Sequence, residues 1–521
     1  MSNSRMTLIV KNSFFGIVSK ISSLVLGFVS RTVFIYFLGM TYLGVSGLYT
    51  EILQMLSLTE LGFGSALIFA LYKPVAENDE HTIRKLLDFY KTTYRIIALI
   101  ISVAGILFVP FIQYIVKGVD NLTLFELRLF FVIYLINTVA NYFVSYKYSY
   151  INALQKNYIV TNIDMIVHLT TIVVQIIVMA ITKSFLAYLM TQTILLVSSK
   201  IIISVYLNKK YPILVQKNNE KLTKQEKAPI YKDVRGLVMH QFSSIAIHST
   251  DNIIISSLSG LGVVAVGLIS NYNLVMTSVL GFVAIVFSSV ISSFGNIVAS
   301  SNSENYRRSF LDLNFINFWM YGFCAIAFFI LLPPFITLWL GKEFLIDKSC
   351  FFIIVLNSYL VGQSTIYNNA RIAKGHFSKD KYLALLQAVI NLVISIIGAL
   401  YLGLIGVYIG TIVSRLVYVL CRPLLTYRFL FEKSSIEYYK QFIKFLGALC
   451  FAGTLTYICT YFILKNVTVT LFVFAMCIVA VLPNAIFLLL FFRTEEFKNI
   501  LIRIKTFRKI KLRKSIEKEK K

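Results

Sequence analysis

The chain has 521 residues, of which 57% are apolar and only 14% are charged, and its mean hydropathy is +0.76. A soluble domain has about a quarter of its residues charged, so these values exclude a cytosolic enzyme, a secreted disulfide-rich domain and a disordered scaffold. The net charge of +26 would suggest a nucleic-acid partner in a soluble protein, but Lys and Arg also gather in the cytoplasmic loops of membrane proteins. The apolar runs are about 20 residues long, which predicts an all-α polytopic membrane protein rather than a barrel. We therefore expect no nucleic-acid partner.

Fourteen apolar runs are long enough to be transmembrane helices. In chain order they cover 13–38, 43–71, 96–116, 122–146, 158–181, 185–206, 237–258, 262–295, 310–332, 349–369, 382–401, 404–421, 445–464 and 467–492. With the N-terminus in the cytoplasm, the inner segments carry 40 Lys and Arg residues and the outer loops carry five. Basic residues favour the cytoplasmic side, so this ratio predicts an even number of spans and both termini in the cytoplasm.

The longest inner segment, 207–236, is rich in Lys and separates two halves of six spans each. We expect an N-lobe at 1–206, a basic linker at 207–236, a C-lobe at 237–440, two further helices at 441–492 and a basic cytoplasmic tail at 493–521. Both halves begin on the cytoplasmic side, so any repeat between them is parallel. A shift of 220 residues without gaps places Lys20 on His240 and Arg31 on Asp251.

The first span carries two cations, Lys20 and Arg31, on one helix face together with small and polar residues. An ionisable side chain inside a membrane usually faces a cavity or a partner. We therefore predict that both cations line a substrate cavity. The alternative is helix packing through the small residues, with the two cations reaching opposite membrane interfaces.

Further ionisable and polar residues within spans are candidates for gating or coupling. In the second span these are Glu51 and Glu60, and Glu60 precedes two glycines that would loosen the helix. In the seventh span His240, His248 and Asp251 suggest either proton coupling or a structural pair between the lobes. Arg31 and Asp251 are expected to pair in one state and to separate when an anion binds Arg31. Secondary candidates are Asn271 and Arg415, although Arg415 also lies where it could reach the inner interface.

Other segments carry local predictions. Residues 74–95 and 494–515 have the pattern of amphipathic helices on the inner leaflet, or of solvated helices that follow the positive-inside rule. Asp164 and His168 are one turn apart and are expected to pair.

No catalytic or metal-binding motif is present in the sequence. It contains no P-loop and no GxSxG elbow, and the outer loops are short. The six cysteines form no CxxC pair, and the five histidines show no HxxxH or HExxH spacing. We expect a secondary transporter that is not an enzyme and has no cofactor or metal.

Five stretches in chain order resemble those of one protein family. They are 31–49 (RTVFIYFLG onward), 58–74 (LTELGFGSA onward), 250–272 (TDNIIIS onward), 371–382 (RIAKGHFSKDKY) and 403–423 (GLIGVYIGT onward). The chain resembles bacterial polysaccharide repeat-unit flippases of the Wzx type, within the multidrug/oligosaccharidyl-lipid/polysaccharide exporter superfamily. The likeness also brings Asn252 and Arg371 into the set of candidate site residues.

The resemblance implies a fold similar to the lipid II flippases, with two six-helix lobes around a central cavity and two C-terminal helices. It implies a flippase in the bacterial cytoplasmic membrane that moves undecaprenyl-diphosphate-linked oligosaccharide repeat units to the outer leaflet by alternating access, for capsule or exopolysaccharide assembly. Membrane lipids, the polysaccharide polymerase and a chain-length regulator are the implied partners. A peptidoglycan-precursor or teichoic-chain flippase and a cationic drug exporter of the same superfamily remain alternatives.

Overall fold

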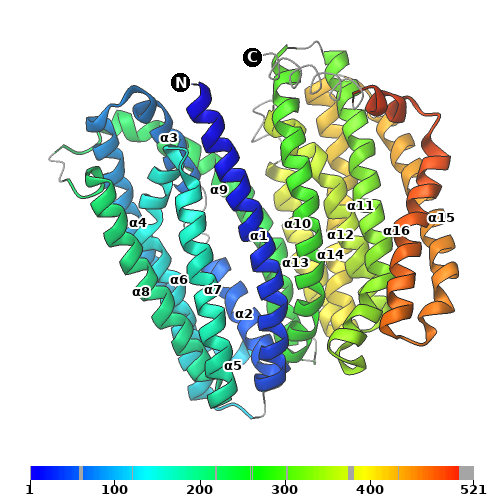
Figure 1. Ribbon diagram of the computed structural model, residues 1–521, viewed down its shortest axis with the longest axis horizontal. Helices are drawn as coiled ribbons and strands as arrows, with labels where there is room; N and C mark the ends of the chain where they lie inside the picture. The colour runs from blue at the N-terminus through cyan, green and yellow to red at the C-terminus, as the bar shows by residue number, and fades with distance from the viewer. Residues whose placement is uncertain are drawn as a thin grey trace, which may run out of the picture. The chain divides into compact units, whose positions relative to one another are not determined.

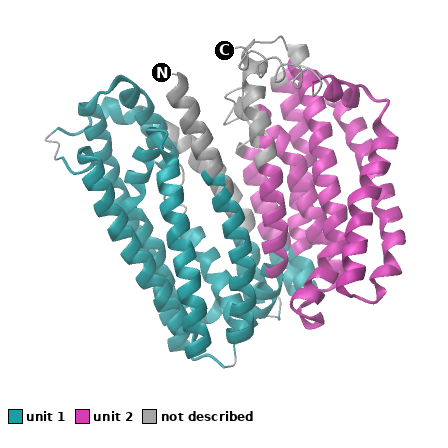
Figure 2. Ribbon diagram, viewed as in Figure 1, with its two compact units in different colours: residues 1–270, 395–407 teal, residues 271–394, 408–521 magenta. Residues whose placement is uncertain are grey.

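The computed structural model describes residues 2–57, 63–119, 121–216, 220–258, 260, 262–300, 303–373, 381–431 and 433–503. Among these, the side chains of 2–14, 17, 233, 235–248, 285–286, 288–300, 303–305, 368–369, 371–373, 381 and 430 lie outside the description. The described residues fold almost entirely into helices (Figure 1). The chain divides into two compact units, residues 1–270 with 395–407, and residues 271–394 with 408–521 (Figure 2).

The first unit is a bundle of long helices. They are α1 (Ser2–Leu38), α2 (Met40–Leu56), α3 (Phe63–Glu77), α4 (Glu80–Phe108), α5 (Ile112–Ile115), α6 (Leu124–Ala153), α7 (Asn157–Thr182), α8 (Phe185–Lys210), α9 (Lys224–Leu258) and the first turns of α10 (Gly262–Ser300), with the 3₁₀ turns η2 (Val109–Phe111) and η3 (Pro212–Leu214). Helix α1 packs chiefly on α7, and α4 packs on α6. Aromatic rings fill the core, as where Phe34 of α1 meets Phe185 and Tyr188 of α8.

Local sequence signals set where several of these helices begin. Thr123 and Glu126 form a reciprocal capping box before α6, in which the Glu126 carboxylate accepts hydrogen bonds from the Thr123 N–H and hydroxyl. Thr223 and Glu226 make the same arrangement before α9. Such caps satisfy N–H groups that the first helical turn leaves without partners. Between α1 and α2 the chain turns at Gly39, whose φ of 83° favours glycine.

The second unit contains the other long helices of the chain. They are the rest of α10, α11 (Ser303–Trp339), α12 (Lys348–Ala373), α13 (Lys381–Leu402, with 395–402 in the first unit), α14 (Leu404–Thr426), α15 (Ile436–Tyr461) and α16 (Val469–Phe491), with the short turns η4 (Lys342–Phe344), η5 (Tyr427–Phe431, a π-helix) and η6 (Ile463–Lys465). Phe318 of α11 stacks on Phe445 of α15 with 4.2 Å between ring centroids. Helices α11, α15 and α16 pack on one another around such rings.

Twelve helices among the described residues are long and apolar enough to span a membrane. Two of the fourteen predicted spans are not in this set. The predicted span 43–71 forms two shorter helices, α2 and α3, on either side of 58–62, and the predicted span 237–258 is the second part of α9. The chain is therefore a multi-pass membrane protein, and the count of fourteen and the lobe boundaries stay predictions.

Three local expectations need correction or refinement. The linker 207–236 is not a loop throughout, because its residues from Lys224 onward are helical and continue into α9. The amphipathic part of 74–95 forms the first three turns of α4. Its apolar residues are buried against protein rather than lipid; they are Ile83, Leu86, Leu87 and Tyr90. The described part of the amphipathic tail, 495–503, is helical and docks on α11, where Arg503 pairs with Asp312 at 2.8 Å.

Candidate functional site

Arg31, the second cation of the first span, is half-buried near the end of α1. Its Nη1 donates a hydrogen bond of 2.7 Å to the hydroxyl of Ser270 in α10, and that hydroxyl in turn donates to the carbonyl of Gly267. The hydroxyl of Tyr188 in α8 lies near enough to interact electrostatically with the guanidinium. Residues of α8 and α10 thus contact the guanidinium of Arg31 on α1.

Glycines bring α10 close to α2 and so place Ser270. A Cβ atom added at Gly44 of α2 would lie 1.9 Å from the carbonyl oxygen of Val263. On the other side of the contact, a Cβ at Gly267 would lie 2.9 Å from the carbonyl oxygen of Met40. The backbones therefore approach each other directly, as small residues permit in membrane helix pairs. Both glycines belong to the stretches that carry the family resemblance.

The other predicted site residues of the first unit fall into three environments. Lys20 is exposed on α1. Glu51 of α2 is half-buried, and its carboxylate lies near Ser249 of α9. Asp251 and Asn252 follow in the next turn of α9 and are half-buried. The Glu51 carboxylate therefore lies close to the α9 segment that contains Asp251.

Other predicted site residues lie outside the described residues or in the second unit. Glu60 is outside the described residues, and so are the side chains of His240, His248 and Arg371. In the second unit Asn271 is fully buried. Arg415 is also buried, and its Nε donates to Asn357 Oδ1 at 3.4 Å, so the suggestion that it reaches the interface was wrong. The hydrogen bond to Asn357 of α12 holds the guanidinium against a neighbouring helix instead.

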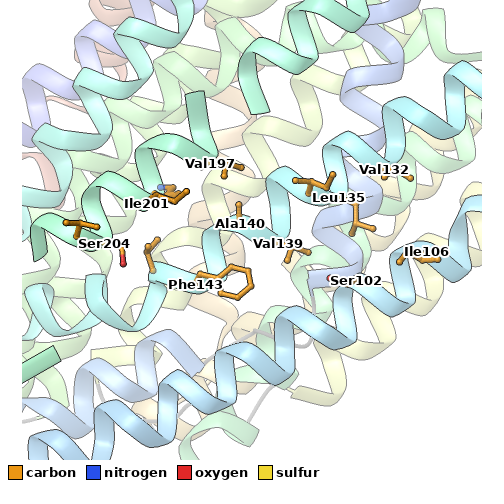
Figure 3. A pocket seen from close by; sticks show the side chains of 14 residues that line it. Ser102, Ile106, Val132, Leu135, Val139, Ala140, Phe143, Val197, Ile201 and Ser204 are labelled. Carbon is orange, nitrogen blue, oxygen red and sulfur yellow. The ribbon is translucent and has the colours of Figure 1, made fainter. Parts of the chain in front are cut away.

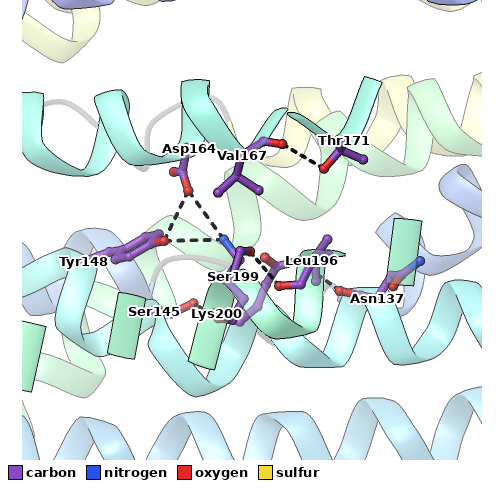
Figure 4. A network of polar contacts seen from close by, with 10 residues as sticks. Asn137, Ser145, Tyr148, Asp164, Val167, Thr171, Leu196, Ser199 and Lys200 are labelled. Carbon is purple, nitrogen blue, oxygen red and sulfur yellow. Dashed lines mark hydrogen bonds and ion pairs between the residues drawn. The ribbon is translucent and has the colours of Figure 1, made fainter. Parts of the chain in front are cut away.

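Sequence reasoning missed a polar cluster that joins α6, α7 and α8. Lys200 Nζ lies 3.6 Å from Asp164 Oδ1 and 3.4 Å from the Tyr148 hydroxyl, and that hydroxyl donates to Asp164 at 3.2 Å (Figure 4). The expected pairing of Asp164 with His168 was therefore wrong, because Asp164 turns to a cation on another helix. The sequence signal that could have predicted this cluster is the presence of Lys200 in one span and Asp164 in the neighbouring span.

A second cation, Lys147, follows directly after the predicted span 122–146, and it is buried in α6. Its ammonium donates to Ser204 Oγ at 2.6 Å and to Asn208 Oδ1 at 2.7 Å, both on α8. In the described part of the chain no group of three or more His, Cys, Asp and Glu residues is placed to hold a metal ion. Arg31 and Lys147 are thus two cations that hydrogen bond to neutral side chains of neighbouring helices.

Long apolar helices with ionisable side chains held between them define a multi-pass membrane protein, and solved structures of membrane transporters share this fold. The lipid II flippase MurJ in an inward closed conformation matches with a TM-score of 0.63 and 14% identity, over 91% of this chain and 98% of its own. The MATE transporter VcmN of Vibrio cholerae matches with a TM-score of 0.58 and 14% identity, over 83% and 98%. A MOP superfamily transporter from Pyrococcus furiosus matches with a TM-score of 0.52 and 15% identity, over 80% and 93%. At these identities the likeness establishes the fold, and it confirms the predicted fold class.

The family follows from the sequence itself. A family model described as polysaccharide biosynthesis protein matches residues 9–292, more than half of the chain, and the chain belongs to this family. No curated protein matches the sequence. The family and the shared fold confirm the predicted resemblance to the polysaccharide members of the exporter superfamily, whose matched structures are transporters and a flippase rather than enzymes.

Proposed function

We propose that this protein is a flippase that translocates undecaprenyl-diphosphate-linked oligosaccharide repeat units from the inner to the outer leaflet of a bacterial cytoplasmic membrane. The units would serve capsule or exopolysaccharide assembly. The observation that carries this proposal is the half-buried guanidinium of Arg31, bonded to neutral Ser270, in a polysaccharide biosynthesis protein. Such a cation offers two parallel N–H donors to a phosphate.

The energetic difficulty of flipping is the desolvation of the diphosphate, since an unpaired charge in an apolar medium is costly. Arg31 would offset that cost by direct ion pairing, and Lys20 would attract the anion before it reaches Arg31. The lipid tail stays in the bilayer during this step and needs no protein cavity of its own. Rocking of two lobes would then expose the headgroup to the other side.

The carboxylates of the first unit would complete the cycle. We propose that Asp251 competes with the diphosphate for Arg31, so that the cation is released when the substrate leaves. Arg31→Asp and Asp251→Arg should each abolish export, and the double exchange should restore part of it. Failure of the double exchange to restore any export, with both single variants inactive and correctly inserted, contradicts the pairing but leaves the anion-binding role of Arg31 standing.

The function is tested by locating the lipid-linked glycan. Cells depleted of the protein are labelled with a membrane-impermeant glycan reagent, before and after permeabilisation. We expect repeat units trapped on the cytoplasmic face, with rescue by the wild type and by Arg493→Ala, an exposed arginine at the end of α16, but not by Arg31→Ala. Normal outward labelling in depleted cells would refute the flippase function.

The likeness to a lipid II flippase supports a second candidate, the export of a peptidoglycan precursor or teichoic chain. The same chemistry at Arg31 serves either headgroup, so the two candidates differ only in the trapped glycan. Mass spectrometry of the lipid-linked glycan that accumulates in depleted cells distinguishes them. A cationic drug exporter is disfavoured, since Arg31 would repel the cargo.

A further inference from the structure

An apolar groove lies between α4, α6 and α8 of the first unit. It has a volume of about 520 Å³ and is lined mainly by aliphatic side chains (Figure 3). Its rim is exposed, with Ile106 and Ile201 each 60% accessible. In a protein of this class, an exposed apolar groove on transmembrane helices is filled by hydrocarbon chains.

A polar cavity adjoins one end of the groove. Its volume is about 300 Å³, and Phe143 and Ser204 line both cavities. The polar cavity contains three cations, Lys91 and Arg95 of α4 and Lys147 of α6. No carboxylate is among the described residues that line it. Asp88 acts electrostatically on Tyr146 but is not part of the lining, so the residues that line the cavity carry a net positive charge.

The cations in this cavity have no anionic partner among the described residues. Lys147 is only 3% accessible, and its ammonium contacts the neutral Ser204 and Asn208. Lys91 lies close enough to Lys147 for their charges to repel. A buried cation without a counter-charge is costly, and an anion between Lys91 and Lys147 would remove that cost.

The groove itself is electrically neutral, although Lys200 lines it. The ammonium of Lys200 turns to Asp164 of α7 and to the Tyr148 hydroxyl of α6 (Figure 4), so its charge is offset within the protein. Along α6 the groove extends from Val144 to Val132, about 18 Å at a rise of about 1.5 Å per residue. That length accommodates one extended acyl chain, whose head would lie at the cationic end.

We propose that this composite cavity binds one anionic phospholipid of the surrounding bilayer, with its phosphate between Lys91, Arg95 and Lys147 and one acyl chain in the groove. Charge complementarity selects an anionic headgroup, as in basic sites between transmembrane helices. The cationic end lies where α4 begins and where α6 and α8 end, the side on which the basic loops gather. The site is separate from Arg31 and does not rest on the proposed transport function.

The test measures lipid binding to the purified full-length protein by native mass spectrometry. Dioleoyl phosphatidylglycerol competes with dioleoyl phosphatidylcholine, and we expect the anionic lipid to be retained. The double variant Lys91→Gln/Arg95→Gln should bind phosphatidylglycerol about 30-fold more weakly, because each basic residue near an anionic lipid contributes about 1 kcal/mol. Lys209→Gln/Lys224→Gln removes the same charge from exposed positions outside the lining and should bind as the wild type does.

A second variant tests the groove independently of the cations. Ala140→Leu occupies part of the groove and should weaken dioleoyl phosphatidylglycerol binding about tenfold, the loss of roughly two buried methylene groups. Equal retention of the two lipids by the wild type, or unchanged binding by both variants, would overturn the proposal. Displacement of the bound lipid by undecaprenyl phosphate at equal concentration would also overturn it, because the occupant would then be a carrier lipid.

Discussion

Arg31 and Ser270 lie 239 residues apart in the chain, and their side chains form a hydrogen bond of 2.7 Å. The bond joins the end of α1 to the first turns of α10, within a unit that also contains the glycine contact of α2 with α10. Ser270 uses its own hydroxyl hydrogen on the Gly267 carbonyl, so its oxygen accepts from the guanidinium in a fixed direction. The arrangement orients the guanidinium of Arg31.

The first prediction concerns this orientation. Ser270→Ala keeps the charge of Arg31 and removes its acceptor, so glycan export should fall about tenfold, in line with roughly 1.5 kcal/mol for a hydrogen bond to a charged group. Arg31→Lys should retain more export than Arg31→Ala. The control is Ser278→Ala, which removes a hydroxyl that bonds only within α10. Export that is unchanged in Ser270→Ala would mean that this bond does not position the cation.

The second prediction concerns the α2 and α10 contact. Gly44→Ala places a methyl group against the backbone of Val263, which cannot rotate away as a side chain can. We expect a destabilisation of about 1–3 kcal/mol, seen as a lower melting temperature in detergent. Gly447→Ala is the matched control, because nothing lies within 4 Å of the added Cβ and alanine favours a helix. Equal melting temperatures for the two variants would contradict the close contact.

The third prediction addresses the cluster of Lys200 and Asp164. Asp164→Asn leaves the Lys200 ammonium beside an apolar groove with only neutral partners, which should cost about 1–3 kcal/mol of unfolding free energy. Lys200→Met should also destabilise the fold. The double variant should be less unstable than the sum of the single changes, since residues that contact each other are coupled. Strict additivity in the melting temperatures would show that the pair does not interact.

The fourth prediction concerns pH at the segment before α9. Lys85, which donates a hydrogen bond to Glu220, and His81 nearby hold the pKa of the Glu220 carboxylate below its ordinary value. A carboxylate with a lowered folded pKa stabilises the docked segment above its unfolded pKa of about 4.3, and that contribution is lost as the pH falls through the lower value. Amide hydrogen exchange at 220–223 should therefore be faster at acid pH than the change in the intrinsic exchange rate alone predicts.

Glu220→Gln isolates this effect from that of Glu226, whose pKa is lowered by the hydrogen bonds from the backbone N–H and hydroxyl of Thr223 in the capping box. In Glu220→Gln, the acid-dependent increase in the hydrogen-exchange rate at 220–223 should fall to the increase that Glu226 alone produces. The same pH profile in wild type and variant would show that Glu220 does not hold this segment.

Sequence patterns predicted much of the helical structure, because the signals for it are local. The capping boxes at Thr123 and Thr223 stand directly before α6 and α9. Hydropathy alone predicted a single span at 43–71, because the apolar run continues across the boundary between α2 and α3. The apolar pattern of 74–95 was read correctly as a helix face, but hydropathy does not distinguish a face against lipid from one against protein.

Composition and short motifs were enough to predict the class of protein, the family and the presence of cations within spans. Which of these charges meet depends on the fold. Lys200 finds Asp164 on a neighbouring helix, Arg31 finds Ser270 far along the chain, and Lys147 is buried among neutral groups. The physical reason is that a side chain's partner inside a membrane is set by how helices pack against one another, and that packing depends on small residues and ring contacts distant in sequence.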